Sequence, residues 1–394
     1  MRFPEFSGEW KCTTIGNIGD IKNGPFGSVL HAEDYVENGI PIVTTEHFKT
    51  GLMPSDKFGI PQVSNEDYIR LKGYRLETND IVFSRVGSVD INAHVGIEQN
   101  GWLFSGRVLR VRPKYDIDSL FLHYALSTEA VKRDIRNRAV GQTMPSINTP
   151  ILSSTTIQLP KDLFEQKKVA HFLRLLDERI ITQNKIIDKL QSLIKGLNQH
   201  LLCSGNDWIT YKLNNLAQIK SGYSGNQISI KTPYKVSRIE TISKHCIDIQ
   251  RIGYVEDIPE SYKLNVSDIL FSNINSVQYI GNTAYLDKDY GLYHGMNLLR
   301  IIPKTDIVVP RFLHLLLCTN KAINHFQTIC NKAVSQASIN QTDLSKSTFA
   351  IPSMSVQQEI CSMFEVVERK LRNEQVFLDN LQRQRRYLLQ QMFI

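Results

Sequence analysis

The chain has 394 residues, 42% of them hydrophobic and 22% charged, and a formal net charge of +7, which fits a globular protein of two domains or more. It contains no apolar run approaching the ~20 residues of a membrane-spanning helix, no signal-peptide pattern at its start, and six cysteines without a C-x-x-C pair. We therefore expect a cytoplasmic protein with reduced thiols, without a disulfide framework or a zinc site.

The first 160 residues are rich in short β-branched runs that end at turn residues, which is the pattern of β-strands. The expected strands are Ile40–Thr45, Asp80–Val86, Val108–Val111 and Thr155–Leu159. Before the last of them, an apolar pattern predicts one helix over Ile117–Ile135. Pro160 then ends the final strand.

A long helix is predicted next. From Val169 to Leu201, apolar residues recur in alternating steps of four and three, interrupted only by Gln183. This period of 3.5 residues is typical of a coiled coil. Because a helix with a single apolar stripe is not stable alone, we expect a second helix to cover it.

The second half repeats this order of elements. Strands are expected at Tyr234–Ile239, Asp268–Ile274, Leu298–Ile302 and Thr348–Ile351. A helix is expected near Pro310–Phe326, and Pro352 ends the last strand. A second heptad stripe then runs from Ile360 to Met392, interrupted by Glu374 and Arg385.

The two long helices are predicted to pair with each other in an antiparallel coiled coil. Gln183 and Glu374 are equivalent at a shift of 191 residues, and each lies near the middle of its helix. In an antiparallel pair the two centres meet, so these polar residues could set the register. Leu190 and Leu381 are the apolar pairing residues that follow them.

Short strings repeat throughout the chain at shifts of 188 to 198 residues. Ile21-Lys22-Asn23-Gly24 corresponds to Ile219-Lys220-Ser221-Gly222, and Asp80–Ser84 corresponds to Asp268–Ser272. The predicted fold is therefore a duplicated α/β (α+β) one, in which two globular domains are separated by two long helices with pseudo-two-fold symmetry. The two globular domains are expected at residues 1–160 and 204–352. The two helical segments are expected at residues 161–203 and 353–394.

Catalytic motifs are missing from the sequence. It has no P-loop, no G-x-G-x-x-G that opens a helix, no G-x-S-x-G, no H-E-x-x-H and no Asn/Asp-Pro-Pro-aromatic stretch of the kind that amino-methyltransferases use. His123 and His314 occupy equivalent positions, and we interpret them as packing residues in preference to metal ligands. The chain is therefore not expected to be an enzyme by itself.

Three duplicated motifs carry a family resemblance. They are the Ile-Lys-x-Gly strings, the string Asp80–Val89 with its copy Asp268–Val277, and the junction Gly141–Asn148 with its copy Ser335–Asn340. Together with the helix that ends each half, they resemble the specificity (S) subunit of Type I restriction–modification systems. The copies differ: Asn273 replaces Arg85, and Asn275 replaces Gly87.

The resemblance implies a non-catalytic, sequence-specific DNA-binding subunit. Each globular domain would read one half of a bipartite target in double-stranded DNA, and the helices would act as a spacer and dock two methyltransferase (M) subunits, which restriction (R) subunits then join. S-adenosylmethionine and ATP would be bound by those partners, so this chain would hold no cofactor or metal. Two alternatives remain open: a self-contained DNA methyltransferase or endonuclease, and a coiled-coil adaptor that does not bind DNA.

The candidate DNA contacts lie in loops that the motifs place together. The base-reading candidates are Thr44, Thr45, His47, Arg85, Ser88, Arg107, Gln142, Ser237, Arg238, Asn273, Asn275, Ser276 and Gln336. The phosphate-binding candidates are Lys22, Lys132, Arg133, Arg136, Arg138 and Lys220. Two interpretations stay open: Arg85 could instead pair with a carboxylate of its own domain, and the Lys132–Arg138 cluster could be a solvated helix face.

The charge balance permits DNA binding without requiring it. Residues 1–160 carry 17 Lys and Arg against 18 Asp and Glu, whereas residues 204–352 carry 15 against 11. A first domain that contacts DNA must therefore do so through a local patch.

Overall fold

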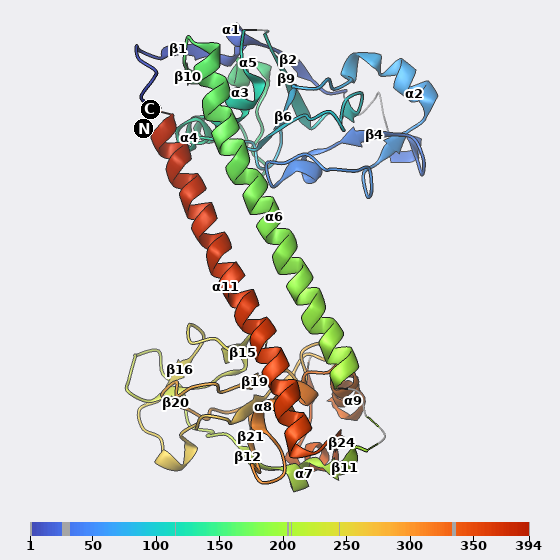
Figure 1. Ribbon diagram of the computed structural model, residues 1–394, viewed down its shortest axis with the longest axis vertical. Helices are drawn as coiled ribbons and strands as arrows, with labels where there is room; N and C mark the ends of the chain where they lie inside the picture. The colour runs from blue at the N-terminus through green and yellow to red at the C-terminus, as the bar shows by residue number, and fades with distance from the viewer. Residues whose placement is uncertain are drawn as a thin grey trace. The chain divides into compact units, whose positions relative to one another are not determined.

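The computed structural model describes residues 2–25, 32–114, 116–202, 205, 207–243, 245–332 and 336–393. The chain forms two compact units, of which the first comprises Met1–Asn184 with Val376–Ile394 and the second comprises Lys185–Gln375. Two helices of 39 residues, α6 (Leu163–Leu201) and α11 (Met354–Met392), contribute to both units (Figure 1). Each helix begins six residues before the apolar stripe predicted for it, at Leu163 and Met354.

The main sheet of the first unit is four-stranded and antiparallel, in the order β2-β9-β6-β7. Its strands are β2 (Gly19–Asn23), β6 (Ile81–Ser84), β7 (Asn92–His94) and β9 (Val108–Pro113). A second sheet, in the order β3-β5-β4-β8, consists of β3 (Tyr35–Val36), β4 (Ile40–Val43), β5 (Gln62–Val63) and β8 (Leu103–Phe104). β1 (Lys11–Thr14) pairs with β10 (Thr156–Leu159) just before α6.

The second unit repeats the main sheet with the order β12-β21-β17-β19. Its strands are β12 (Ala217–Ser221), β17 (Ile269–Phe271), β19 (Thr283–Tyr285) and β21 (Leu299–Pro303). Three smaller sheets contain β13 (Lys235–Val236), β14 (Ile242–Ser243), β15 (Cys246–Ile247), β16 (Gly253–Tyr254), β18 (Ile274–Asn275), β20 (Leu292–Tyr293), β22 (Asn331–Lys332) and β23 (Ala337–Ser338). β11 (Ile209–Lys212) pairs with β24 (Thr348–Ile351), as β1 pairs with β10.

The single helix predicted over Ile117–Ile135 is wrong. The structure has two helices there, α3 (Ser119–Leu126) and α4 (Glu129–Arg138), and the second unit has α8 (Pro310–Leu317) and α9 (Asn320–Ile329) in place of one helix. The physical reason is local, because the hydroxyl groups of Thr128 and Thr319 bond to the carbonyl oxygens of Ala125 and Leu316, both at 2.8 Å. Such bonds end one helix and start the next.

The remaining helices are short, and all but α2 and η1 of the first unit have a counterpart in the second. In the first unit they are α1 (Ile15–Ile18), α2 (Asn65–Arg70), α5 (Thr149–Ser153), η1 (Ala32–Asp34), η2 (Thr45–Phe48) and η3 (Lys72–Tyr74). In the second they are α7 (Leu213–Leu216), α10 (Gln341–Lys346), η4 (Ile239–Thr241) and η5 (Glu260–Tyr262). No helix in the described ranges is long and apolar enough to cross a membrane.

Within each unit the long helices run antiparallel and share the hydrophobic core. In the first unit, Val169 and Leu173 of α6 lie in one cluster with Leu388 and Met392 of α11. In the second unit, the cluster combines Phe364 of α11 with residues from the end of α6. The predicted apolar stripes are confirmed, because every stripe residue is buried or half-buried.

The polar interruptions of the stripes have defined surroundings. Arg385 forms an ion pair with Asp177 inside the first unit. Gln183 is buried, with 4% of its surface exposed, and Glu374 forms an ion pair with Lys370 of its own helix. Leu381 is buried and Leu190 half-buried. That Gln183 and Glu374 set the register stays a prediction.

Candidate nucleic-acid interface

The candidate site of the first unit is built around the turn Ser105–Arg107, which connects β8 to β9. Strand β4 holds the start of this turn, since the Ser105 N–H donates to the Val43 oxygen at 2.9 Å. The residue that follows strand β2 holds its other side, since the Gly24 N–H donates to the Val108 oxygen at 3.1 Å. A Cβ atom on Gly24 would lie 2.0 Å from the Ser105 oxygen. The Ile-Lys-x-Gly motif therefore ends in glycine because the turn packs directly against it.

Arg85 follows β6 and holds the same turn. Its backbone N–H donates to the Arg107 oxygen at 3.0 Å, and its guanidinium donates to the Gly106 oxygen at 3.1 Å. Arg107 itself is exposed at the tip. The structure thus brings the predicted residues Arg85 and Arg107 together, but Arg85 is half-buried and its guanidinium is bonded to the turn.

Thr44, Thr45 and His47 lie beside this turn, at the end of β4 and in η2. The Thr44 N–H donates to His47 Nδ1 at 3.1 Å, which closes a capping box. Burial lowers the pKa of His47, so the neutral imidazole is favoured. Because Nδ1 accepts a hydrogen bond, Nε2 carries the proton and serves as a donor.

The second unit has the same construction with different side chains. A Cβ atom on Gly222 would lie 1.9 Å from the Gly295 oxygen, and the Ser237 hydroxyl accepts the Gly295 N–H at 3.0 Å. Ser237 is fully buried, so the prediction that it reads a base is not supported, and it positions the turn instead. Arg238 is exposed next to it, with an ion pair to Glu240 at 3.4 Å.

A surface depression of about 340 Å³ adjoins this turn of the second unit. Besides Arg238, it is lined by the amide side chains Asn226, Gln227 and Asn297. These three amides were not predicted from the sequence. For Asn297, the internal repeat of the sequence contains the signal, because a shift of 190 residues places Asn297 on Arg107 and Leu298 on Val108.

The predicted readers Asn273, Asn275 and Ser276 make hydrogen bonds within their own unit. Asn273 donates to the Ile339 oxygen at 3.4 Å, and Asn275 donates to the Ser272 hydroxyl at 3.2 Å while accepting the Ser276 N–H at 2.8 Å. All three side chains are half-buried. Like Arg85, they follow the central β-strand of their sheet and stabilise the connection after it.

Other candidates remain on the surface, outside this cluster of contacts. Ser88, Gln142 and Gln336 are exposed in loops. Lys220 is exposed on β12, whereas the ammonium of Lys22 lies 5.1 Å from the ring centroid of Tyr74. Whether any of them contacts DNA stays a prediction.

The basic cluster on α4 is only partly available. Arg136 forms ion pairs with Asp90 and Glu129, and Arg138 forms an ion pair with Asp134 and donates to the Ile151 oxygen at 2.9 Å. Their charges are therefore partly neutralised within the first unit, which weakens them as phosphate contacts. Arg133 is exposed and Lys132 half-buried, so they are the better candidates.

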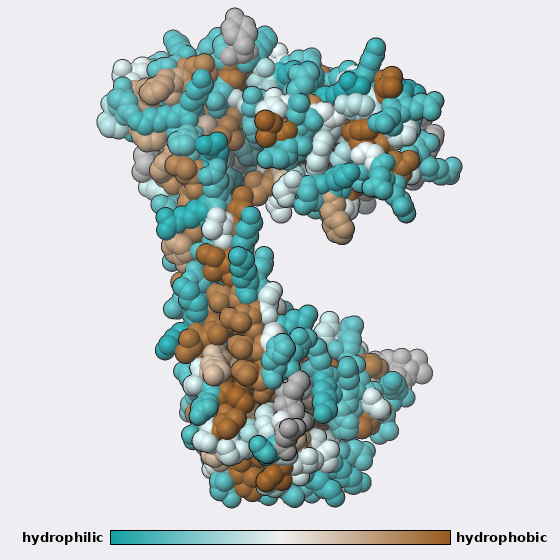
Figure 2. Space-filling view, turned by 45° about the vertical axis from the view of Figure 1, so that its right-hand side comes forward, coloured by the Kyte–Doolittle hydropathy of each residue, from teal (hydrophilic) through white to brown (hydrophobic). Residues whose placement is uncertain are grey.

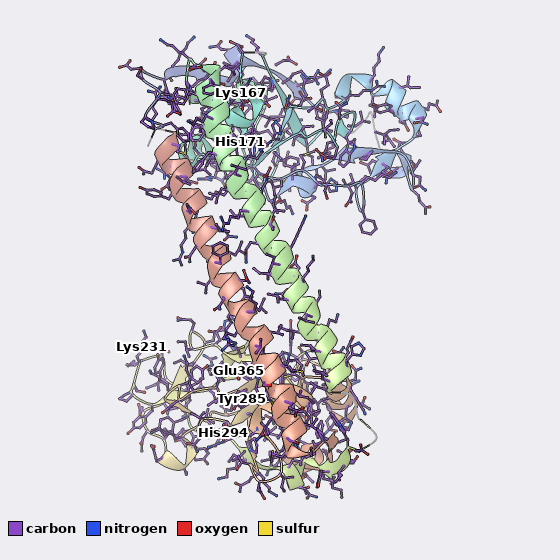
Figure 3. The ribbon with its side chains drawn as sticks, in the orientation of Figure 1. Lys167, His171, Lys231, Tyr285, His294 and Glu365 are labelled. Carbon is purple, nitrogen blue, oxygen red and sulfur yellow. The ribbon has the colours of Figure 1, made fainter. Side chains whose placement is uncertain are left out.

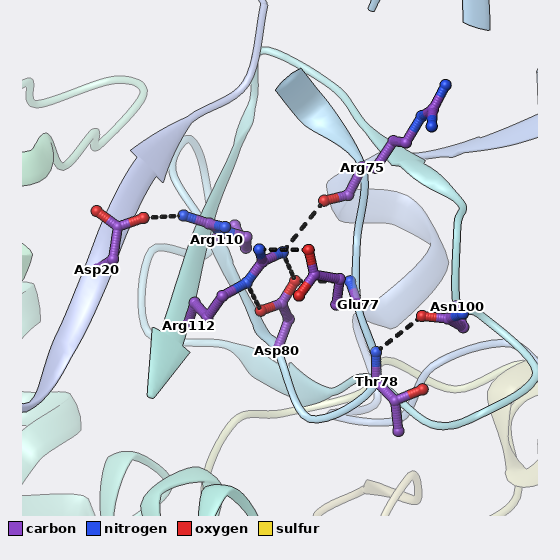
Figure 4. Close-up of polar contacts among 8 residues, drawn as sticks. All are labelled: Asp20, Arg75, Glu77, Thr78, Asp80, Asn100, Arg110 and Arg112. Carbon is purple, nitrogen blue, oxygen red and sulfur yellow. Dashed lines mark hydrogen bonds and ion pairs between the residues drawn. The ribbon is translucent and has the colours of Figure 1, made fainter. Parts of the chain in front are cut away.

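Carboxylate–guanidinium pairs support the sheet beneath each turn. In the first unit, Arg112 forms a bidentate pair with Asp80 at 2.7 and 2.8 Å, while Arg110 pairs with Asp20 (Figure 4). In the second unit, Asp268 pairs with Arg300 at 2.6 Å, with 3% and 5% of their side chains exposed. The aspartate that begins the second duplicated motif is therefore structural.

Histidines inside the units are packing residues. His123 Nδ1 lies 2.7 Å from the side-chain oxygen Oδ1 of Asn92, and His294 Nε2 donates to the backbone oxygen of Leu298 at 2.9 Å. Burial lowers the pKa of His123 to about 3 and that of His294 to about 4, and it lowers the pKa of His314 as well. Among the described residues, no group of three or more His, Cys, Asp or Glu side chains is arranged to hold a metal.

We expect the buried neutral imidazoles of His123 and His294 to make the protein unstable in acid. The unfolded chain protonates near pH 6.5, well above the folded pKa values, so the unfolded state binds more protons below that pH. Stability is fully present above pH 6.5 and is lost as the pH falls towards 4 and 3, by up to ~1.4 kcal/mol per pH unit for each histidine. Urea unfolding between pH 7.5 and 5 measures this slope.

His123→Gln and His294→Gln should each flatten the slope, because they remove one of these groups. The matched control is His171→Gln, whose histidine is exposed on α6 (Figure 3). A slope that is unchanged in both core variants would contradict the prediction.

Comparison with known proteins identifies similar sequences. The family model described as "Type I restriction modification DNA specificity domain" matches twice, at residues 7–192 and 205–382. The putative type I restriction enzyme MjaX specificity subunit of Methanocaldococcus jannaschii is 40% identical over 163 residues, which are 40% of this chain and 38% of that protein. The MjaVIII specificity subunit of the same organism is 26% identical over 286 residues, 66% of this chain and 60% of that protein. The matches thus span less than two thirds of either relative.

A solved structure shares the fold. The crystal structure of the Type-I restriction-modification system S subunit from M. genitalium aligns with 100% of this chain and 99% of its own, with a TM-score of 0.63 and 15% identity. The duplicated arrangement of α/β units and long helices therefore recurs in another chain.

Proposed function

This chain belongs to the Type I restriction modification DNA specificity family, and from this premise we propose that it is the non-catalytic DNA-reading subunit of a Type I restriction–modification complex. The observation that carries the proposal is the duplicated turn, held rigidly by a glycine contact in each unit but with different exposed side chains. Each unit would read one half of a bipartite DNA target. The complex would act on cytoplasmic double-stranded DNA.

The chemistry of the exposed side chains suits base reading in the major groove. An arginine can donate two hydrogen bonds to guanine, and an asparagine or glutamine can pair with adenine in a bidentate manner. Arg107 and Arg238 provide the former, and the amides around the depression of the second unit provide the latter. Lys132, Arg133 and Lys220 would add phosphate contacts that contribute affinity without sequence information.

The long helices would separate the two readers. At 1.5 Å per residue, a helix of 39 residues is about 58 Å long. Removing or adding one heptad in both helices would change its length by about 10 Å, or close to three base pairs. The helices would therefore determine the spacing between the half-sites.

Each unit exposes apolar side chains on its long helices, and we propose that these apolar patches dock the methyltransferase subunits. In the first unit they are Phe172, Leu175 and Phe377, and in the second Met363, Val366 and Ile186, all at least 37% exposed. The two sets are equivalent at a shift of 191 residues. Figure 2 shows apolar side chains, in brown, along the surface of these helices. Duplicated patches fit two copies of one partner.

We expect Leu175→Lys and Val366→Lys each to release one methyltransferase subunit. A charge placed in an apolar interface weakens it by about 2 kcal/mol or more, roughly 30-fold in affinity. Native mass spectrometry of the purified complex should then show one methyltransferase subunit with either variant and none with the double variant. The control is Gln191→Lys, at an exposed α6 position outside the patches. Retention of two subunits in the double variant would refute these docking sites.

The partners would also supply the cofactor chemistry. We propose that the methyltransferase subunits bind S-adenosylmethionine and that restriction subunits bind ATP, while this chain binds neither. Isothermal titration of the isolated chain with either compound tests this part of the proposal, and binding in the micromolar range would contradict it.

Mapping of methylated adenines tests the function as a whole. The reconstituted complex should methylate a bipartite motif, and the methyltransferase without this chain should methylate none. Methylation or cleavage by this chain alone would support the self-contained enzyme instead. If no DNA binding occurs with or without the methyltransferase, the chain is an adaptor.

A further inference from the structure

We infer that Arg107 and Asn297 are equivalent specificity-determining residues, of which Arg107 reads a guanine in one half-site and Asn297 reads an adenine at the corresponding position of the other. This inference rests on the proposed function and adds base identity to it. It begins from the structural equivalence of the two turns.

The register of the main sheet supports that equivalence, because Ile21 pairs with Val111 as Ile219 pairs with Ile301, although three residues separate β8 from β9 and five separate β20 from β21. Val43 and Phe104 are paired in parallel strands before the turn of the first unit, and Val236 and Tyr293 are paired in the same way in the second. The motif glycines, Gly24 and Gly222, meet the carbonyl oxygens of Ser105 and Gly295. Counting two residues on from these carbonyls gives Arg107 and Asn297.

Both turns are held by hydrogen bonds to their backbone. In the first unit, five hydrogen bonds from the flanking segments and within the turn hold Ser105–Val108: Ser105 N to Val43 O, Val108 N to Ser105 O, Gly24 N to Val108 O, Arg85 N to Arg107 O and Arg85 Nη1 to Gly106 O. In the second unit, Ser237 Oγ accepts the Gly295 N–H, and buried His294 donates to the Leu298 oxygen. A fixed backbone positions the tip side chain with little loss of conformational entropy on binding.

The tip side chains, in contrast, are available. Arg107 and Asn297 are both exposed, and among the described residues neither side chain has a hydrogen-bond partner. Asn297 has φ of 62°, a left-handed conformation that asparagine tolerates better than most residues. The structure therefore presents one unpaired guanidinium and one unpaired amide, as far as the described ranges extend, at corresponding positions of two similar turns, of which only Asn297 has a left-handed backbone.

The first residue of the capping box beside each turn also differs between the units, and there the arginine is in the second unit. Thr44 begins the capping box beside Arg107, whereas Arg238 begins the equivalent capping box beside Asn297. Each turn therefore has one arginine close to its tip, but from a different segment. Because of this exchange, the guanidinium would enter the major groove of DNA at a different point in each unit. The two half-sites should therefore differ in the order of their bases.

Two polar variants test the assignment. Arg107→Gln keeps a polar side chain but removes the guanidinium fork, whose two parallel N–H groups donate to guanine O6 and N7. Asn297→Asp keeps shape and backbone tolerance but removes the donor that adenine N7 needs, while the carboxylate can accept from cytosine N4. The matched controls are Lys114→Gln and Asn215→Asp, which lie just beyond the ends of β9 and β12 that are opposite to the turns.

The measurement is the methylation rate of the reconstituted complex on duplexes that carry each of the four bases at every target position. We expect Arg107→Gln to lose about 10-fold or more of the preference for guanine at one position of one half-site. We expect Asn297→Asp to lose a similar preference for adenine in the other half-site and to gain cytosine. Both controls should keep the wild-type motif.

Two results would overturn the inference: a wild-type motif in either variant, or a rate that falls equally for all four bases, since the residue then contributes affinity without discrimination. These results differ from failure of the proposed function, in which the wild-type complex itself methylates no bipartite motif. Methyltransferase binding, measured by native mass spectrometry, confirms that each variant is folded.

Discussion

Asp268→Ala should destabilise the second unit by about 3–5 kcal/mol, which is the usual cost of leaving a buried charge without its partner. Arg300 has 5% of its side chain exposed and pairs with Asp268 at 2.6 Å. The same carboxylate accepts the Asn265 N–H at 2.6 Å, which closes the turn before β17. Removal of Asp268 therefore leaves the buried guanidinium with only its hydrogen bond to the Lys263 oxygen, and it also opens the turn before β17.

The first unit provides the matched comparison. Asp80 is equally buried, but its partner Arg112 is 32% exposed and also pairs with Glu77. After Asp80→Ala, Arg112 can be hydrated, so we expect a smaller loss of about 1–3 kcal/mol. Urea unfolding with amide hydrogen exchange assigns each loss to its unit. Equal losses in the two variants would show that exposure of the arginine does not matter.

Gly24→Ala and Gly222→Ala should each abolish the reading of one half-site. The new Cβ atom would lie 2.0 Å or 1.9 Å from a backbone carbonyl oxygen, and backbone cannot rotate away as a side chain can. Accommodation of this clash costs about 1–3 kcal/mol and displaces the turn that carries Arg107 or Asn297. A displacement of about 1 Å is enough to break bidentate geometry with a base.

Methylation of the bipartite motif by the reconstituted complex measures this effect. Each variant should lose discrimination in one half-site while the other is still read. Gly196→Ala is the control, because a Cβ atom at Gly196 in α6 meets no atom within 4 Å and alanine favours the helix. Unchanged discrimination in Gly24→Ala and Gly222→Ala would mean that the turns do not position the reading residues.

Local patterns in the sequence were sufficient for much of the architecture. The two heptad stripes predicted helices that the structure shows to be of equal length, 39 residues each. A repeat of 3.5 residues depends only on the neighbouring turns of one helix, so the sequence alone determines it. The strands β6 and β10 were predicted for a similar reason, since β-branched runs between turn residues indicate extended backbone. Local patterning was less successful at the break between α3 and α4, where one threonine hydroxyl decides the outcome.

Pairing over long sequence distances determined the candidate site. The sequence placed Arg85, Ser237 and Arg136 among the DNA contacts because of their residue types. In the folded units, Arg85 bonds to the Gly106 oxygen, Ser237 is buried against Gly295, and Arg136 pairs with Asp90. Each of these partners is at least 21 residues away in the chain.

The sequence by itself thus determined the duplication, the two long helices and the family to which the chain belongs. Only the tertiary structure decided which polar side chains are exposed at the turns and which are used to hold them, as it did for Arg107 and Arg85. The physical reason is that exposure depends on strand order and register, which join segments such as Val43 and Ser105 that are far apart in sequence. A residue type indicates what a side chain could bind, but its hydrogen bonds within the fold decide whether it is available to do so.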